Sequence, residues 1–231
     1  IMLGTPNGGS YSIPVMLTAR DPLVRKLALL DLGHNHAELQ SIIARFPGAL
    51  QMLPVQTRWD FFDPAFWTKL AEDDHGGKDK PWSLPVQKDL DEARSARNVL
   101  DASPIDPQRM LYVAGCAEAT PFDLEFAADA AVGKRLRFQA TARGDGRVPW
   151  ETGIPPGVRT WYMDATHGDL ADHEEAFPAL LELLQQGATT RLATTPPAVR
   201  GALTRFELPE APEPAVLPDE EDLAAAALGA C

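Results

Sequence analysis

The sequence predicts an α/β fold in which a sheet carries a long helical insertion as a cap. Three observations predict this class. Strand-like runs lie on both sides of residues 20–100, those residues carry mainly helical patterns, and the last strand-like run is followed by an amphipathic helix. Strands that alternate with helical segments are typical of α/β sheets.

Four short runs predict the strands, at residues 1–3, 109–115, 135–141 and 158–163. The first, Ile1-Met2-Leu3, leads directly into a segment rich in glycine, proline and asparagine. Such a transition is expected where a buried strand reaches the edge of a sheet. Residues 135–141 alternate polar and apolar side chains, which predicts a half-exposed strand.

Four segments carry the apolar spacing of amphipathic helices, at residues 24–30, 39–46, 85–100 and 177–184. We expect Gly33 to end the first helix and Pro47-Gly48 to stop the second. The last helix tolerates Pro178 in its first turn and ends at Gly187. Between the second and third helices, residues 73–80 are polar and predict a flexible loop.

Aromatic residues are concentrated around that loop, at Trp59, Phe61, Phe62, Phe66, Trp67 and Trp82. They could line an acyl-binding groove, because apolar side chains line most small-molecule sites. Packing of a small helical subdomain onto the sheet is the favoured interpretation, since large aromatic side chains are usually buried.

The end of the chain has a different composition. Residues 207–231 contain seven carboxylates and no lysine or arginine, and proline recurs from Pro196 onward. This is the composition of a linker or a disordered acidic Pro/Ala tail. We therefore expect residues 1–19 and 101–190 to form a partial core, residues 20–100 to form the cap, and residues 191–231 to form the tail.

Charge and cysteine content restrict the partners. The net charge is −12, of which residues 1–206 carry only −5, so nothing favours a polyanion and no nucleic-acid partner is expected.

Cys116 and Cys231 make no disulfide framework, which fits a reducing, cytoplasmic compartment. No apolar run reaches the ~20 residues of a membrane span, and no signal peptide is visible.

An aspartate and a histidine on successive predicted loops are the candidate catalytic residues. Asp145 lies in Gly-Asp-Gly-Arg-Val-Pro-Trp, His167 follows twenty-two residues later, and the predicted strand 158–163 separates them. Acyl transfer needs a base that takes the proton from a weakly nucleophilic hydroxyl. It also needs an acid that orients this base. The glycines beside Asp145 permit a tight turn, and Gly168 would let the backbone pass close to the histidine. The alternative is an ordinary turn and a surface histidine.

Four segments resemble α/β-hydrolases of the lecithin:cholesterol acyltransferase-like, lipase and esterase branch. They are the Gly-Thr-Pro segment at residues 4–10, the cap motif at residues 43–54, the acid loop at residues 144–150 and the histidine loop at residues 166–168. The resemblance implies the C-terminal part of an α/β-hydrolase sheet with a helical cap, acting on small-molecule or lipid esters. By this resemblance, Asp145 would be the acid and His167 the base.

The resemblance supplies no nucleophile within this chain. The motif G-x-S-x-G does not occur, and in that family the serine precedes the Gly-Thr-Pro segment, which places it upstream of Ile1. Ser10 and Ser12 lack the strand-turn-helix context of a nucleophile. We expect a serine-type ester hydrolase or acyltransferase, inactive as this fragment alone, with further domains of the parent chain on both sides. The alternative is a non-catalytic interaction or regulatory module on the same scaffold.

Two groups of histidines could be considered as metal ligands, His34 with His36 and His167 with His173. His34 and His36 are two residues apart and do not share a helix face, so a helix connection with Asn35 as the N-cap is favoured. His167, Asp169 and His173 match no metallohydrolase spacing. The sequence therefore predicts no metal and no cofactor.

Overall fold

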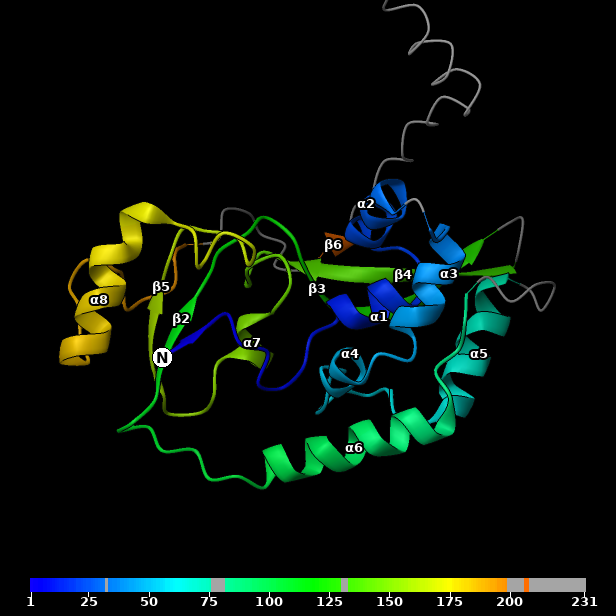
Figure 1. Ribbon diagram of the computed structural model, residues 1–231, viewed down its shortest axis with the longest axis horizontal. Helices are drawn as coiled ribbons and strands as arrows, with labels where there is room; N and C mark the ends of the chain where they lie inside the picture. The colour runs from blue at the N-terminus through cyan, green and yellow to red at the C-terminus, as the bar shows by residue number, and fades with distance from the viewer. Residues whose placement is uncertain (32, 76–81, 130–132, 199–205, 208–231) are drawn as a thin grey trace, which may run out of the picture.

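Two small sheets organise this mixed α/β protein (Figure 1). The structure is a computed structural model and describes residues 1–31, 33–75, 82–129, 133–198 and 206–207. The first sheet is parallel, in the order β1-β2-β5, and consists of β1 (Met2–Leu3), β2 (Leu111–Ala114) and β5 (Arg159–Tyr162). The second is antiparallel, in the order β3-β4-β6, and consists of β3 (Thr120–Asp129), β4 (Gly133–Thr141) and β6 (Phe206–Glu207). Strands β3 and β6 lie outside the four runs predicted as strands.

Strand β2 lies at the centre of the parallel sheet and is buried along its whole length. Its side chains alternate between two apolar clusters, as the two-residue period of a strand requires. Leu111 and Val113 pack in the cluster that contains Leu183 of α8 (Phe177–Gln186). Tyr112 and Ala114 pack in the other cluster, with Trp150 of α7 (Trp150–Gly153). Both faces of this strand are thus covered, as is usual for a parallel sheet.

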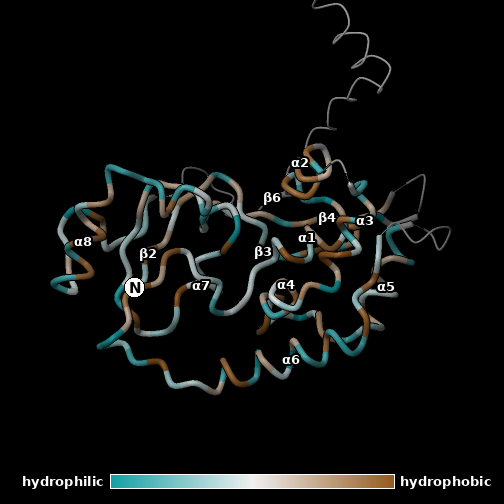
Figure 2. Tube along the Cα trace, in the orientation of Figure 1, coloured by the Kyte–Doolittle hydropathy of each residue, from teal (hydrophilic) through white to brown (hydrophobic). Residues whose placement is uncertain are grey.

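The described part of residues 20–100, the segment predicted as the cap, consists mainly of helices and connecting loops. Its helices are α2 (Pro22–Leu30), α3 (His36–Ile43), α4 (Pro47–Gln51), α5 (Pro64–His75) and α6 (Gln87–Asp101), and the short α1 (Ser12–Leu17) precedes them. Apolar and polar residues alternate along α6 (Figure 2), which buries Leu90 and Ala93.

Two local expectations in the cap were wrong. The helix expected to reach Phe46 and stop at Pro47-Gly48 ends at Ile43, and Pro47 is instead the first residue of α4, where the missing amide hydrogen costs nothing. Residues 73–75 lie in the last turn of α5 instead of in a loop. The rest of that predicted loop, residues 76–80, lies outside the described residues.

The connection at His34–His36 has the predicted N-cap. The Asn35 side chain accepts a hydrogen bond from the Glu38 amide at 3.0 Å, and the Glu38 carboxylate accepts one from the Asn35 amide at 2.8 Å. This reciprocal pair is a capping box. His34 meets Asp31 at 2.9 Å on the surface.

The aromatic residues of the cap serve packing, as favoured from the sequence. Phe61 and Trp67 are fully buried, and they share one apolar cluster with Leu124, Leu136 and Phe138 of the antiparallel sheet. The β3–β4 hairpin therefore packs against the cap helices, although its residues fall in the segment predicted as core.

Part of the predicted tail is ordered against this hairpin. Phe206 and Glu207 form β6, which pairs with Ala140 and Gln139 of β4. Residues 199–205 and 208–231 lie outside the described residues. Among the helices that the structure describes, none is both long and apolar enough to cross a membrane.

Candidate active site

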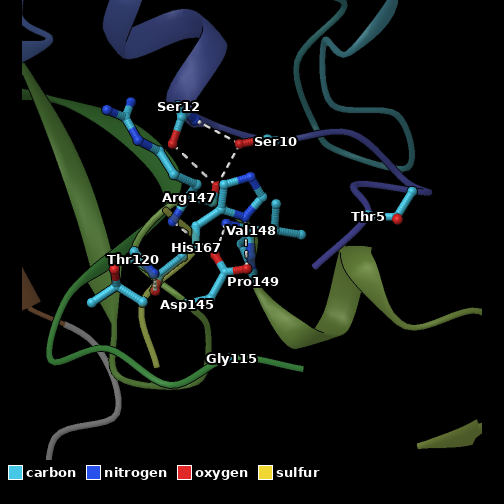
Figure 3. A network of polar contacts seen from close by, with 12 residues as sticks. Thr5, Ser10, Ser12, Gly115, Thr120, Asp145, Arg147, Val148, Pro149 and His167 are labelled. Carbon is cyan, nitrogen blue, oxygen red and sulfur yellow. Dashed lines mark hydrogen bonds and ion pairs between the residues drawn. The ribbon is translucent and has the colours of Figure 1, made fainter. Parts of the chain in front are cut away.

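Asp145 and His167 form a hydrogen-bonded pair (Figure 3). The distance between Asp145 Oδ2 and His167 Nδ1 is 2.8 Å, and the His167 amide donates to the Asp145 carbonyl at 2.7 Å. The aspartate side chain is 2% exposed, whereas that of the histidine is 37% exposed. A buried carboxylate thus holds one ring nitrogen of a histidine that solvent can reach.

The parallel sheet places the histidine loop. Beyond the last residue of β5, Met163 donates to the carbonyl of Ala114, and Cys116 donates to the carbonyl of Ala165, each at 2.9 Å. These bonds continue the pairing of β2 and β5 past the ends of both strands. His167 therefore follows a segment whose position the sheet fixes, as its place after a predicted strand suggested.

The acid loop fixes the second carboxylate oxygen of Asp145. Asp145 Oδ1 accepts hydrogen bonds from the amides of Arg147 at 2.9 Å and of Val148 at 2.7 Å. The turn needs a positive φ of 95° at Gly146, a conformation that glycine adopts without strain. The Gly146 amide in turn donates to Thr120 Oγ1 at 2.8 Å. One oxygen of the carboxylate thus holds its own loop, and the other holds the histidine.

Two glycines at strand ends allow the backbone to approach this pair. A Cβ atom on Gly4, which follows β1 with φ 55°, would lie 2.7 Å from Asp145 Oδ2 and 3.0 Å from His167 Nδ1. A Cβ atom on Gly115, which follows β2, would lie 2.8 Å from Asp145 Cβ. Gly168 does not have the role expected of it, because a Cβ atom there would have no neighbour within 4 Å.

Gly4→Ala should therefore destabilise the protein and disturb the pair. Both the left-handed backbone and the contact with Asp145 oppose a side chain, and we expect a loss of about 1–3 kcal/mol in the free energy of unfolding. Urea denaturation measures this loss. Gly168→Ala is the matched control and should change stability by less than about 0.5 kcal/mol. Equal stability of the two variants would contradict the packing role of Gly4.

Arg147 ties the acid loop to the start of the cap. Its carbonyl accepts hydrogen bonds from Ser10 Oγ at 2.5 Å and from Ser12 Oγ at 3.1 Å, as Figure 3 shows. Its guanidinium forms an ion pair with Asp21, whose side chain is 2% exposed. Asp21 also caps α2 by accepting from the Leu23 amide at 2.7 Å. Neither role of Arg147 is evident from the sequence alone.

The Asp145 charge acts on two buried or half-buried groups, the Tyr112 hydroxyl and the Cys116 thiol, and the pKa of each is raised. Burial, with a smaller effect of the Asp145 charge, raises the pKa of Tyr112. Burial and the charges of Asp164 and Asp145 raise the pKa of the Cys116 thiol to about 11. A thiol with this pKa is protonated at neutral pH, so Cys116 lacks the thiolate that nucleophilic attack requires.

The alternative metal sites are not assembled. Among the described residues, no three histidine, cysteine or acidic side chains lie together in a geometry that could hold a metal ion. Asp169 instead accepts a hydrogen bond from Thr166 Oγ1 at 2.6 Å, and His173 precedes a short 3-10 helix at Glu174–Ala176.

Comparison with protein families, with characterised proteins and with solved structures found no match to this chain. Asp145 follows β4 of the antiparallel sheet and His167 follows β5 of the parallel sheet, and the two side chains meet at 2.8 Å with unequal exposure.

Proposed function

We propose that this chain supplies the acid and the base of a serine-type ester hydrolase or acyltransferase. The observation that carries the proposal is the 2.8 Å contact between buried Asp145 and accessible His167. In the proposal, the nucleophilic serine comes from a part of the protein that precedes Ile1. The substrates are small-molecule or lipid esters, and the chemistry needs no cofactor.

His167 acts first as a base and then as an acid. As the serine hydroxyl attacks the ester carbonyl, His167 Nε2 takes its proton, and the new C–O bond gives a tetrahedral intermediate. The intermediate collapses, the C–O bond to the alcohol breaks, and His167 returns the proton to the leaving oxygen. Water or an acceptor alcohol then reacts with the acyl-enzyme by the same two proton transfers.

Asp145 stays ionised throughout these steps. Its Oδ2 holds the proton of His167 Nδ1, which leaves Nε2 without a proton and able to accept one. When the ring becomes an imidazolium, the same carboxylate stabilises the positive charge. The amides of Arg147 and Val148 hold the carboxylate in place, so that little reorganisation is needed during the reaction.

Neither serine near the pair is assigned the nucleophilic role. The hydroxyls of Ser10 and Ser12 both donate to the Arg147 carbonyl, and their residues are only 4% exposed. A nucleophile would have to offer its proton to His167. These two hydroxyls instead support the loop that carries the acid.

Labelling of the intact protein with a fluorophosphonate tests the proposal. We expect one serine N-terminal to Ile1 to be modified stoichiometrically, because only an activated serine reacts with this reagent. The 231-residue chain alone should remain unlabelled. If the folded intact protein takes up no label, the non-catalytic interaction module on this scaffold becomes the better explanation. Label on Ser10 would contradict the assignment of the serines.

A further inference from the structure

Helix α2 presents an apolar stripe to solvent. Leu23, Leu27 and Leu30 are four and three residues apart, so they lie on one face of the helix, and they are 45%, 46% and 80% exposed. Val24, on another face, is buried. An amphipathic helix normally turns its apolar face toward a core, so this leucine stripe marks an interaction surface. We propose that residues 219–228 of the same chain dock on it. The proposal concerns binding alone and does not depend on the proposed catalytic function.

The charge of α2 is positive, although the protein as a whole is acidic. The helix contains Arg25 and Lys26 and no carboxylate. The flanking carboxylates of Asp21 and Asp31 are each hydrogen-bonded to another side chain, and within the described ranges no ion pair joins either cation of α2 to a carboxylate. Lys26 is three residues after the first leucine of the stripe and four before the last, which places its ammonium group beside the stripe.

Residues 219–228 complement this surface in their sequence. Four carboxylates, at residues 219–222, are followed by Leu223, four alanines and Leu228. Acidic residues in a first turn, alanines after them and a glycine at Gly229 are the pattern of a short helix. A helix of this length is marginal by itself in water, so it needs an apolar partner. The carboxylates would meet Lys26 while the apolar residues cover the leucine stripe.

The tail starts from a position that allows it to reach α2. Strand β6 pairs with residues close to the end of β4, and the acid loop leaves β4 at the same end. Arg147 of this loop binds Asp21 at the N-terminus of α2. The chain between Glu207 and Asp219 can extend over about 40 Å, whereas α2 is only ~14 Å long. Because the tail is tethered at this end, its effective concentration at α2 exceeds that of a second chain in dilute solution.

A second exposed apolar stripe, on α8, does not fit the same segment. Phe177, Leu181 and Leu184 have the same spacing as the leucines of α2 and are also exposed. The only charged residue of α8 is Glu182, which binds Arg191 at 2.7 Å. An acidic segment finds no cation on this helix. Charge therefore selects α2 as the docking surface of the tail.

Zero-length cross-linking of the 231-residue chain with a water-soluble carbodiimide tests the docking. The reagent condenses a lysine amine with a carboxylate that touches it, and an amide bond forms with loss of water. We expect mass spectrometry to identify a link between Lys26 and residues 219–222 in the monomer. Lys88 is the internal control, because it is exposed and lies on α6 near Glu92. It should form no link to the tail.

Two matched double variants test the leucine stripe. Leu27→Gln/Leu30→Gln should lower the initial rate of the Lys26 link at least about tenfold, because the burial of two leucine side chains is lost. Leu181→Gln/Leu184→Gln makes the same substitutions at the same spacing on α8 and should leave the rate unchanged. All four side chains are exposed, so both variants should keep the thermal melt of the unmodified chain.

Three results would overturn the proposal. The first is the absence of a link between Lys26 and the tail. The second is an equal rate in the two double variants with unchanged thermal melts. The third is a link that joins two chains, which would assign the stripe to a second copy of the protein. A mixture of isotope-labelled and unlabelled chains distinguishes this case, because only links between chains combine the two isotopes.

Discussion

Replacement of His167 by alanine should abolish ester turnover by the intact protein. The substitution removes the only group that the proposal assigns to both proton transfers, and loss of a triad histidine lowers kcat by roughly 10⁶-fold in serine hydrolases. Hydrolysis of a chromogenic short-chain ester measures the loss. Labelling by a fluorophosphonate should slow in parallel, because the serine would no longer be activated.

His173→Ala is the matched control for this experiment. His173 lies six residues further along the chain, beside the 3-10 helix at Glu174–Ala176, and has no assigned part in the chemistry. It should retain full turnover. If His167→Ala also retained turnover, His167 would not be the base and the proposed function would fail.

Asp145→Asn should lower kcat by about 10⁴-fold while the fold is preserved. The asparagine carbonyl oxygen can still accept from the amides of Arg147 and Val148, so the loop keeps its hydrogen bonds. The amide nitrogen then faces His167 Nδ1 and donates to it, which forces the proton onto Nε2. With Nε2 protonated, the histidine cannot take the proton of the serine.

The control for this substitution is Asp164→Asn, an exposed carboxylate on the loop that leads from β5 to His167. Both variants should have urea midpoints near that of the unmodified protein, and only Asp145→Asn should lose turnover. Full turnover in Asp145→Asn would show that the carboxylate does not orient the histidine. Loss of folding in Asp145→Asn alone would assign it a structural role instead.

The proximity of Asp145 and His167 could be predicted because it depends on local patterns. Asp145 lies in a glycine-rich segment and His167 follows a strand-like segment, and both patterns are typical of loops. A single predicted strand separates the two loops. Strand β3 was not predicted, although Phe122, Leu124 and Phe126 alternate with polar residues. Pro121 at its start weakens the strand signal, and the structure accommodates it with a register shift between Pro121 and Asp123.

Other parts of the site depend on contacts that no local pattern reveals. Arg147 and Asp21 are 126 residues apart, and their sequence neighbourhoods show only a turn and a helix N-cap. The close approach of Gly4 to the pair likewise depends on how β1 joins the sheet. The type of each loop can be inferred from composition, whereas the partner of each loop follows from the assembled fold.

The ion pair between Arg147 and Asp21 couples the acid loop to the first turn of α2. Exchange of residues 20–100 for the insertion of another protein would remove the aspartate that receives the Arg147 guanidinium. A graft that keeps an aspartate at the N-cap of its first helix would preserve this junction. Helix α6 has a comparable junction of its own, because the buried Arg97 donates to the carbonyl of Asn7.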